Sequence, residues 1–176
     1  MKHLVGCTLL AATLLAAPAM ALVDRLNLSS NPLSSTLDLH SLANEKINLI
    51  EASFAQVASM GADVVETFYE ELFARNPKVK PMFFRKSMAE QRQHLLSALT
   101  MVISNLRNPD KIAPVLRTLG ANHMGYGVVP VHYGAVVDAF LATLRTMLGD
   151  AAKPEILAAW RDGLHAIANV MLHREA

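Results

Sequence analysis

The spacing of the apolar side chains constrains this chain more than any other feature of its sequence. From Ser41 onward these side chains recur every three or four residues, which places them on one face of an α-helix. No segment there alternates apolar and polar residues with the β-branched content typical of a strand. The pattern predicts an all-α domain over residues 41–176, with Ser41 as a helix cap, preceded by a loose arm over residues 22–40.

Local start and stop signals divide this domain into six long helices and one short one. Pro109, Pro130 and Pro154 are each typical of the first turn of a helix. The Asn76-Pro77 pair is typical of a helix end. The expected helices cover residues 41–60, 61 or 63 to 76, 87–106, 109–123, 130–148 and 154–176, with a short turn-rich piece at 79–84.

The first 21 residues have the pattern of a secretory signal peptide. Lys2 gives a positive start, an apolar run covers residues 4–17, and Pro18 is followed by the small residues that signal peptidase requires, in Ala19-Met20-Ala21. We expect cleavage after Ala21, no remaining membrane span, and a periplasmic or secreted protein. The alternative is a retained leader that anchors the protein in the membrane, although the run is short for the ~20 residues that a span needs.

Composition excludes several functional classes. Lys and Arg total 16 against 15 Asp and Glu, so the chain lacks the basic excess of a nucleic-acid-binding protein. Cys7 is the single cysteine, which excludes an intrachain disulfide and an all-cysteine metal site. A length of 176 residues suits one domain and leaves no room for a fused flavin reductase.

His123 is the histidine most suited to hold a metal. Ile112, Leu116 and Leu119 lead to it at helical spacing, so it falls on an apolar stripe. No second histidine lies three or four residues away, which disfavours a locally built zinc site. One ligand from an apolar helix is what haem iron needs, because the porphyrin supplies the other four. The alternative is a histidine that is hydrogen-bonded within the structure, which is the more common role of a lone histidine.

Two further polar side chains fall on apolar helix faces. Gln91 lies one turn before Leu95 on its stripe, and Tyr69 lies among the apolar residues of the helix before. A glutamine and a tyrosine that face the interior are hydrogen-bond donors in search of an acceptor. Alternatively, both extend to the edge of the core or bond to the backbone.

Several stretches together resemble one protein family. The mature chain is similar to single-domain bacterial globins, of the type related to flavohaemoglobin haem domains, over about residues 44–175. The resemblance implies a globin fold of six to seven helices around a pocket for haem b, which is held without a covalent link. The stretches that carry it are Thr67-Phe68-Tyr69-Glu70-Glu71-Leu72-Phe73, Asn76-Pro77, Lys80-Pro81-Met82-Phe83, Leu119-Gly120-x-x-His123-x-x-Tyr126-Gly127-Val128, His132-Tyr133 and Ala159-Trp160.

On the distal side of the haem, the resemblance assigns four residues. Tyr69 and Gln91 match the pair that donates hydrogen bonds to bound oxygen. Leu95 matches the apolar residue beside them, and Phe83 matches the phenylalanine that packs on the haem face. Partners for the haem propionates are not identified by the resemblance; the nearby candidates are Arg92 and His94, for which a solvent-facing position is the alternative.

On the proximal side, His123 matches the ligand of the haem iron. Val128 matches a residue that packs near this side, and Tyr133 matches a tyrosine that contacts the proximal histidine. Glu175 falls where the family has a glutamate that completes a His-Tyr-Glu network. Such a network would raise the basicity of the imidazole and increase electron density at the iron.

The resemblance implies a partner that is a small diatomic gas: oxygen, NO or CO. We expect reversible oxygen binding, for transport or storage. The alternative is an enzyme, a nitric oxide dioxygenase or weak peroxidase that depends on a separate reductase. A gas sensor and a helical bundle without cofactor are further hypotheses. The lack of room for a reductase favours binding over catalysis.

Overall fold

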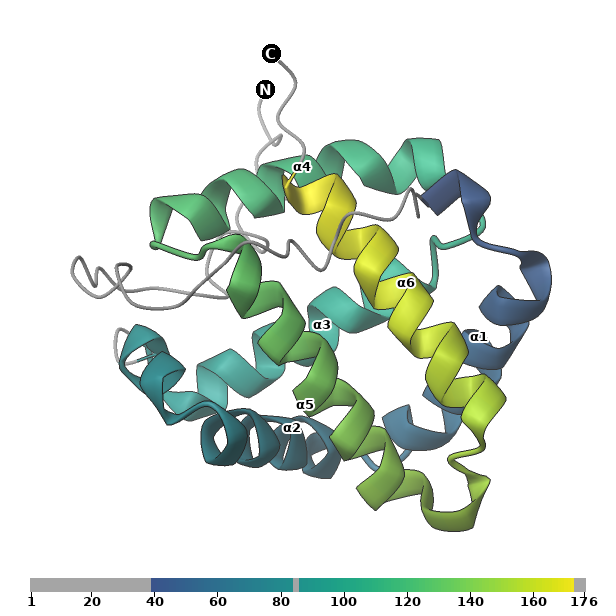
Figure 1. Cartoon of the computed structure of the whole chain (residues 1–176), viewed down its shortest axis with the longest axis horizontal. Coiled ribbons are helices and arrows are strands. Elements are labelled where there is room, and N and C mark those ends of the chain that lie inside the picture. The colour runs from purple at the N-terminus through teal and green to yellow at the C-terminus, as the bar shows by residue number, and fades with distance from the viewer. Residues whose placement is uncertain (1–38, 84–85, 173–176) are drawn as a thin grey trace, which may run out of the picture.

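A computed structural model describes residues 39–83 and 86–172 of the chain (Figure 1). These residues form six α-helices and three short 3-10 helices, and they contain no strand, so the prediction of an all-α domain is confirmed. The expected leader, nearly all of the expected arm, and Glu175 lie outside the described residues. The elements, in chain order, are η1 (Leu39–Ser41), α1 (Asn44–Ala58), α2 (Ala62–Arg75), η2 (Pro77–Phe83), α3 (Met88–Ile103), α4 (Pro109–Gly125), α5 (Pro130–Leu148), η3 (Gly149–Ala151) and α6 (Pro154–Leu172).

Most helices begin where the local signals predict. α4, α5 and α6 each begin at the expected proline. α3 follows a capping box, in which Ser87 and Glu90 satisfy each other's backbone N–H groups. α2 begins after Gly61, whose φ of 62° lies in the left-handed region that favours glycine.

Three helix ends differ from the prediction. Ser41 does not cap α1; it lies in η1, which buries Leu39 against the core, and α1 begins at Asn44. α3 ends at Ile103 rather than near Leu106, because its last turn tightens into i→i+3 backbone hydrogen bonds. α4 continues two residues past His123, to Gly125.

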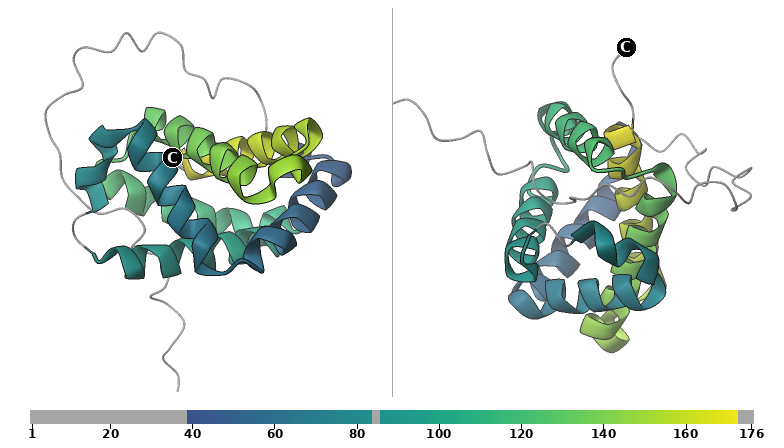
Figure 2. Two further views of the ribbon diagram at one scale, coloured as in Figure 1. Left: turned by 90° about the horizontal axis from the view of Figure 1, so that it is seen from below. Right: turned by 90° about the vertical axis from the view of Figure 1, so that its left-hand side faces the viewer.

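The core is built around the packing of α5 and α6 on the other helices. α5 packs on α2, while α6 packs on α1, α4 and α5. Trp160 of α6 is buried at this junction, where its indole N–H donates to Ser53 Oγ of α1 (2.8 Å) and its ring lies 4.8 Å from that of Phe140 of α5. The right-hand view of Figure 2 shows α3 on one side and α5 on the other, with α4 above and α2 below.

α4 and α6 cross with their backbones in direct proximity. A Cβ atom on Gly120 would lie only 1.8 Å from the carbonyl oxygen of Met171, so the crossing tolerates glycine alone at this position. Gly120 is one turn before His123 on α4, and the crossing therefore sets the position of that histidine.

No helix among the described residues is by itself long and apolar enough to cross a membrane. α4 and the following segment Pro130–Ala151 are together long and apolar enough, but the chain bends by 112° between them.

Candidate functional site

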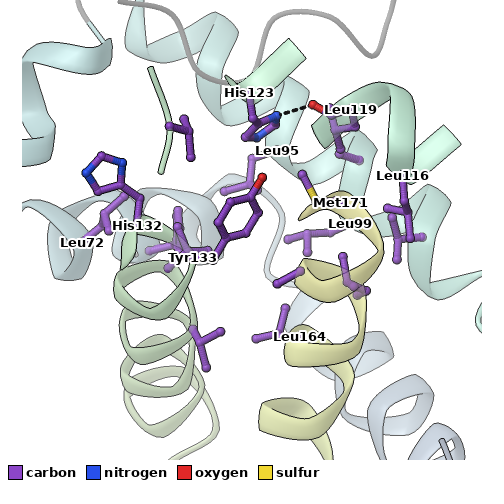
Figure 3. Close-up of a pocket in the computed structure, with 18 of the residues that line it drawn as sticks. Leu72, Leu95, Leu99, Leu116, Leu119, His123, His132, Tyr133, Leu164 and Met171 are labelled. Carbon is purple, nitrogen blue, oxygen red and sulfur yellow. Dashed lines mark hydrogen bonds between the residues drawn. The ribbon is translucent and has the colours of Figure 1, made fainter. Parts of the chain in front are cut away.

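A pocket opens between α2, α3, α4, α5 and α6 (Figure 3). About 950 Å³ of space free of atoms lies within it, its solvent-open part included. Among the described residues that line it, all are apolar except two tyrosines and two histidines: Tyr69, His123, His132 and Tyr133. Six of the predicted site residues line this pocket: Phe83, Tyr69, Leu95, His123, Val128 and Tyr133.

His123 lies on the pocket wall and is only 4% exposed. Its Nδ1 atom is 2.7 Å from the carbonyl oxygen of Leu119, one turn earlier on α4 (Figure 3). A carbonyl can only accept, so Nδ1 carries the proton and the lone pair is on Nε2. Burial lowers the pKa of the imidazole, and the hydrogen bond to Leu119 partly offsets this shift. The buried ring is therefore neutral at pH 7 and able to act as a ligand.

Tyr133 and Val128 pack near His123. The Tyr133 ring projects from the first turn of α5, and its centroid lies 6.3 Å from that of His123 at an interplanar angle of 29°. The backbone N–H of Val128 donates to the carbonyl oxygen of His123 (3.0 Å), which ties the end of α4 to the following loop. Burial raises the pKa of the Tyr133 hydroxyl to about 12, and this hydroxyl has no hydrogen-bond partner among the described residues. It is a buried donor, and the Glu175 carboxylate that the family resemblance implies beside it lies outside those residues.

Tyr69 reaches the pocket from α2. It is 3% exposed and packs edge-on against Phe83 of η2, with ring centroids 5.6 Å apart. Its hydroxyl donates a long hydrogen bond to the backbone carbonyl of Gln91 on α3 (3.4 Å). Burial raises its pKa well above the ordinary value, and the nearby Arg92 guanidinium offsets this only in part. Tyr69 therefore stays protonated and keeps a hydrogen to donate.

Gln91 is completely buried, but it is not among the residues that line the pocket. Neither its Oε1 nor its Nε2 atom has a hydrogen-bond partner among the described residues. Leaving a buried carboxamide unpaired costs about 1–3 kcal/mol for each group. Such a group close to Tyr69 is a strong indication that a ligand belongs in the adjacent space. Leu95, one turn further along α3, lines the pocket directly.

The sequence did not single out His132 as a pocket residue. His132 lies on the first turn of α5, is half-buried and lines the pocket, and its Nδ1 accepts from the backbone N–H of Val129 (3.3 Å). Burial lowers its pKa. In the sequence, the one signal for this placement is that His132 directly precedes Tyr133 in the first turn of a helix. That turn borders both the pocket and solvent.

The two candidates for propionate partners do not reach the pocket wall. Arg92 instead pairs with Glu66 of α2, and neither Arg92 nor His94 lines the pocket. In the part of the chain that the structure describes, no three His, Cys, Asp or Glu side chains are grouped closely enough to hold a metal ion.

Comparison with known proteins decides the family. A sequence model of the family described as Globin matches residues 66–171, which is more than half of the chain. The chain belongs to the globin family. The expected globin fold is thereby confirmed, and the family implies that this globin binds haem.

The globin is similar both to flavohemoproteins, which are much longer than this chain, and to a bacterial globin that it nearly spans. It is 31% identical over 138 residues to the flavohemoprotein of Xylella fastidiosa (strain Temecula1), and 28% identical over 137 residues to that of Rhizobium meliloti. Each match covers 77% of this chain but only 34% of the flavohemoprotein. A bacterial globin from Campylobacter jejuni superposes with a TM-score of 0.63 at 26% identity, covering 72% of this chain and 91% of that one.

The residues of the pocket fit haem. The neutral buried imidazole of His123 offers Nε2 as an iron ligand, and the apolar wall suits a porphyrin ring. The unpaired carboxamide of Gln91 and the Tyr69 hydroxyl belong to α3 and α2, away from the α4 helix that carries His123. His123 would hold the haem, and the Tyr69 hydroxyl, with the Gln91 carboxamide near it, would offer hydrogen-bond donors from two other helices.

Proposed function

We propose that this globin binds oxygen reversibly on a haem held by His123. The observation that carries the proposal is the buried pair of Tyr69 and Gln91, whose polar atoms are poorly satisfied within an apolar surrounding. Bound haem supplies an iron with one coordination position open to a diatomic gas. The residues of the chain then decide how firmly a gas is held there.

On the proximal side, His123 acts through Nε2. Its Nδ1–H donates to Leu119, which selects the tautomer and orients the ring. The carbonyl acceptor also increases the basicity of the imidazole. Tyr133, packed beside the ring, restricts its rotation.

On the distal side, Tyr69 and Gln91 act as hydrogen-bond donors. The raised pKa of Tyr69 keeps its hydroxyl protonated, so it would be able to donate a hydrogen bond to a gas molecule held in the pocket. The Gln91 amide has hydrogens that no described protein group accepts. Both donations slow the departure of the gas, and the apolar Leu95 and Phe83 exclude water.

Removing either donor is expected to accelerate oxygen release. A hydrogen bond to a charged acceptor contributes roughly 1.5–3 kcal/mol, so Tyr69→Phe should raise the oxygen dissociation rate roughly ten- to hundredfold, and Gln91→Leu should also raise it. Stopped-flow displacement of oxygen by CO measures this rate. Tyr126→Phe is the matched control, because Tyr126 does not line the pocket. Equal rates in the native protein and both distal variants would contradict the proposal.

Nitric oxide dioxygenation, or a weak peroxidase activity, is the second candidate, and the similarity to flavohemoproteins favours considering it. A dioxygenase needs an electron after each turnover, whereas an oxygen carrier does not. We expect the oxygen-loaded globin, mixed with excess NO and ascorbate as reductant, to consume one equivalent of NO in a single burst. Continued NO consumption with nitrate formation over many equivalents would show that the globin is a dioxygenase rather than an oxygen carrier. The nitrate yield per protein distinguishes the two outcomes.

A further inference from the structure

α3 carries Gln91 and Leu95, and it packs closely on one neighbouring helix. Its principal packing partner among the described helices is α2. The right-hand view of Figure 2 shows why: the opposite side of α3 faces the interior, and α5 and α6 stand on the far side of it. The pocket occupies that interior, with walls from α3 on one side and α5 and α6 on the other. The contact with α2 is therefore the closest helix packing that α3 makes.

An ion pair joins the two helices next to both distal residues. Nη2 of Arg92 lies 2.7 Å from Oε1 of Glu66. Arg92 directly follows Gln91 on α3, and Glu66 is three residues before Tyr69 on α2, which is nearly one helical turn. The pair thus bridges α2 and α3 at the level of the Tyr69–Gln91 contact.

This pair differs from an ordinary surface salt bridge. Exposed pairs contribute little, because water and salt screen the charges. The Arg92 and Glu66 side chains are 33% and 46% exposed, so the distinction rests on the Nε atom of Arg92, which is buried with no hydrogen-bond partner among the described residues. Without Glu66, this partly buried guanidinium would lose the carboxylate that it pairs with, and α2 and α3 would lose a side-chain link at this level.

We propose that the Glu66–Arg92 ion pair is a positioning device that holds α3 against α2 and so sets the separation of the Tyr69 hydroxyl and the Gln91 carboxamide. Neither residue lines the pocket. The pair acts through the helices that carry the distal donors. The inference rests on the proposed role of Tyr69 and Gln91 in holding a diatomic gas.

The test compares Glu66→Gln, Arg92→Gln and the double variant in the haem-loaded protein with CO bound. The C–O stretching frequency reports the donors that face the ligand. A positioning role predicts that both single variants shift the band in the same direction, toward higher wavenumber. A direct effect of charge would shift it in opposite directions, because one variant removes a positive and the other a negative charge.

Three further measurements complete the test. The oxygen dissociation rate should rise about three- to tenfold in either single variant, and the double variant should show no additional rise, because the two residues act as a unit. Amide hydrogen exchange in α3 of the cofactor-free protein should accelerate. The control removes another ion pair, Glu51–Arg107, of similar length (2.6 Å), with Glu51→Gln and Arg107→Gln; neither residue lines the pocket, and the CO band should not move.

Opposite band shifts, unchanged bands, or additive effects on the dissociation rate would each overturn the inference. Tyr69→Phe separates this failure from failure of the proposed function. If Tyr69→Phe moves the CO band and the ion-pair variants do not, the positioning role is wrong and the distal pair stands. If Tyr69→Phe also leaves the band unchanged, the proposed role of the distal pair is wrong.

Discussion

Replacing His123 with alanine is expected to yield a folded globin that no longer retains haem. The buried imidazole is the one predicted protein ligand of the iron, and its Nε2 lone pair is freed by the hydrogen bond from Nδ1 to Leu119. Loss of this ligand should weaken haem retention by at least about a hundredfold, or roughly 3 kcal/mol. Titration of the cofactor-free protein with haemin, followed by the Soret band and by transfer of haem to an acceptor protein, measures the change.

His132→Ala is the matched control for this experiment. His132 is the other histidine that lines the pocket, but its Nδ1 accepts from the backbone of Val129 and it is only half-buried. We expect this variant to keep a native Soret band. In His123→Gly, added imidazole should occupy the vacated space and restore the band. A native spectrum in His123→Ala would show that another residue holds the iron.

The second large effect is expected at Gly120. In an unhindered helix, Gly→Ala is stabilising by up to about 1 kcal/mol. Here the new Cβ would lie 1.8 Å from the Met171 carbonyl oxygen, which is backbone and cannot rotate away. α4 and α6 would have to separate, so Gly120→Ala should lower the free energy of unfolding by roughly 3 kcal/mol or more. Urea denaturation followed by circular dichroism measures the loss.

Gly134→Ala supplies the comparison on a neighbouring helix. A Cβ atom at Gly134, in α5, would meet no described atom within 4 Å, so this variant should be as stable as the native protein or slightly more so. The Gly120→Ala variant should also lose haem more readily, since displacement of α4 moves His123. Equal unfolding midpoints for the two variants would show that the helix crossing is not tight.

Signals that are local in the sequence predicted the helices well. Pro109, Pro130 and Pro154 act within their own first turns, so they mark the starts of α4, α5 and α6 without knowledge of the rest of the fold. Ser41 failed as a cap because Leu39, two residues earlier, packs into the core and draws this segment into η1. A tertiary contact of this kind outweighs a capping preference of about 1 kcal/mol.

The site was predictable only where a residue's helix face decides its position. Periodicity placed Tyr69 and His123 on inner faces, and both line the pocket. Gln91 is buried as its stripe predicts, but it is not among the residues that line the pocket, because a stripe does not specify which neighbour it meets. The pairing of Glu66 with Arg92 depends on how α2 and α3 cross, and spacing along the chain does not encode that crossing.

The two faces of the pocket are supported by different parts of the molecule. His123 belongs to a helix locked to α6 by the backbone contact at Gly120, whereas Gln91 belongs to a helix that depends mainly on α2. Natural selection can therefore act on them separately. Under the proposed function, substitutions along the α2–α3 contact would retune gas affinity in small steps while the cofactor stays in place. Substitutions at the α4–α6 crossing would be expected to displace His123 and so to affect cofactor retention and gas binding together.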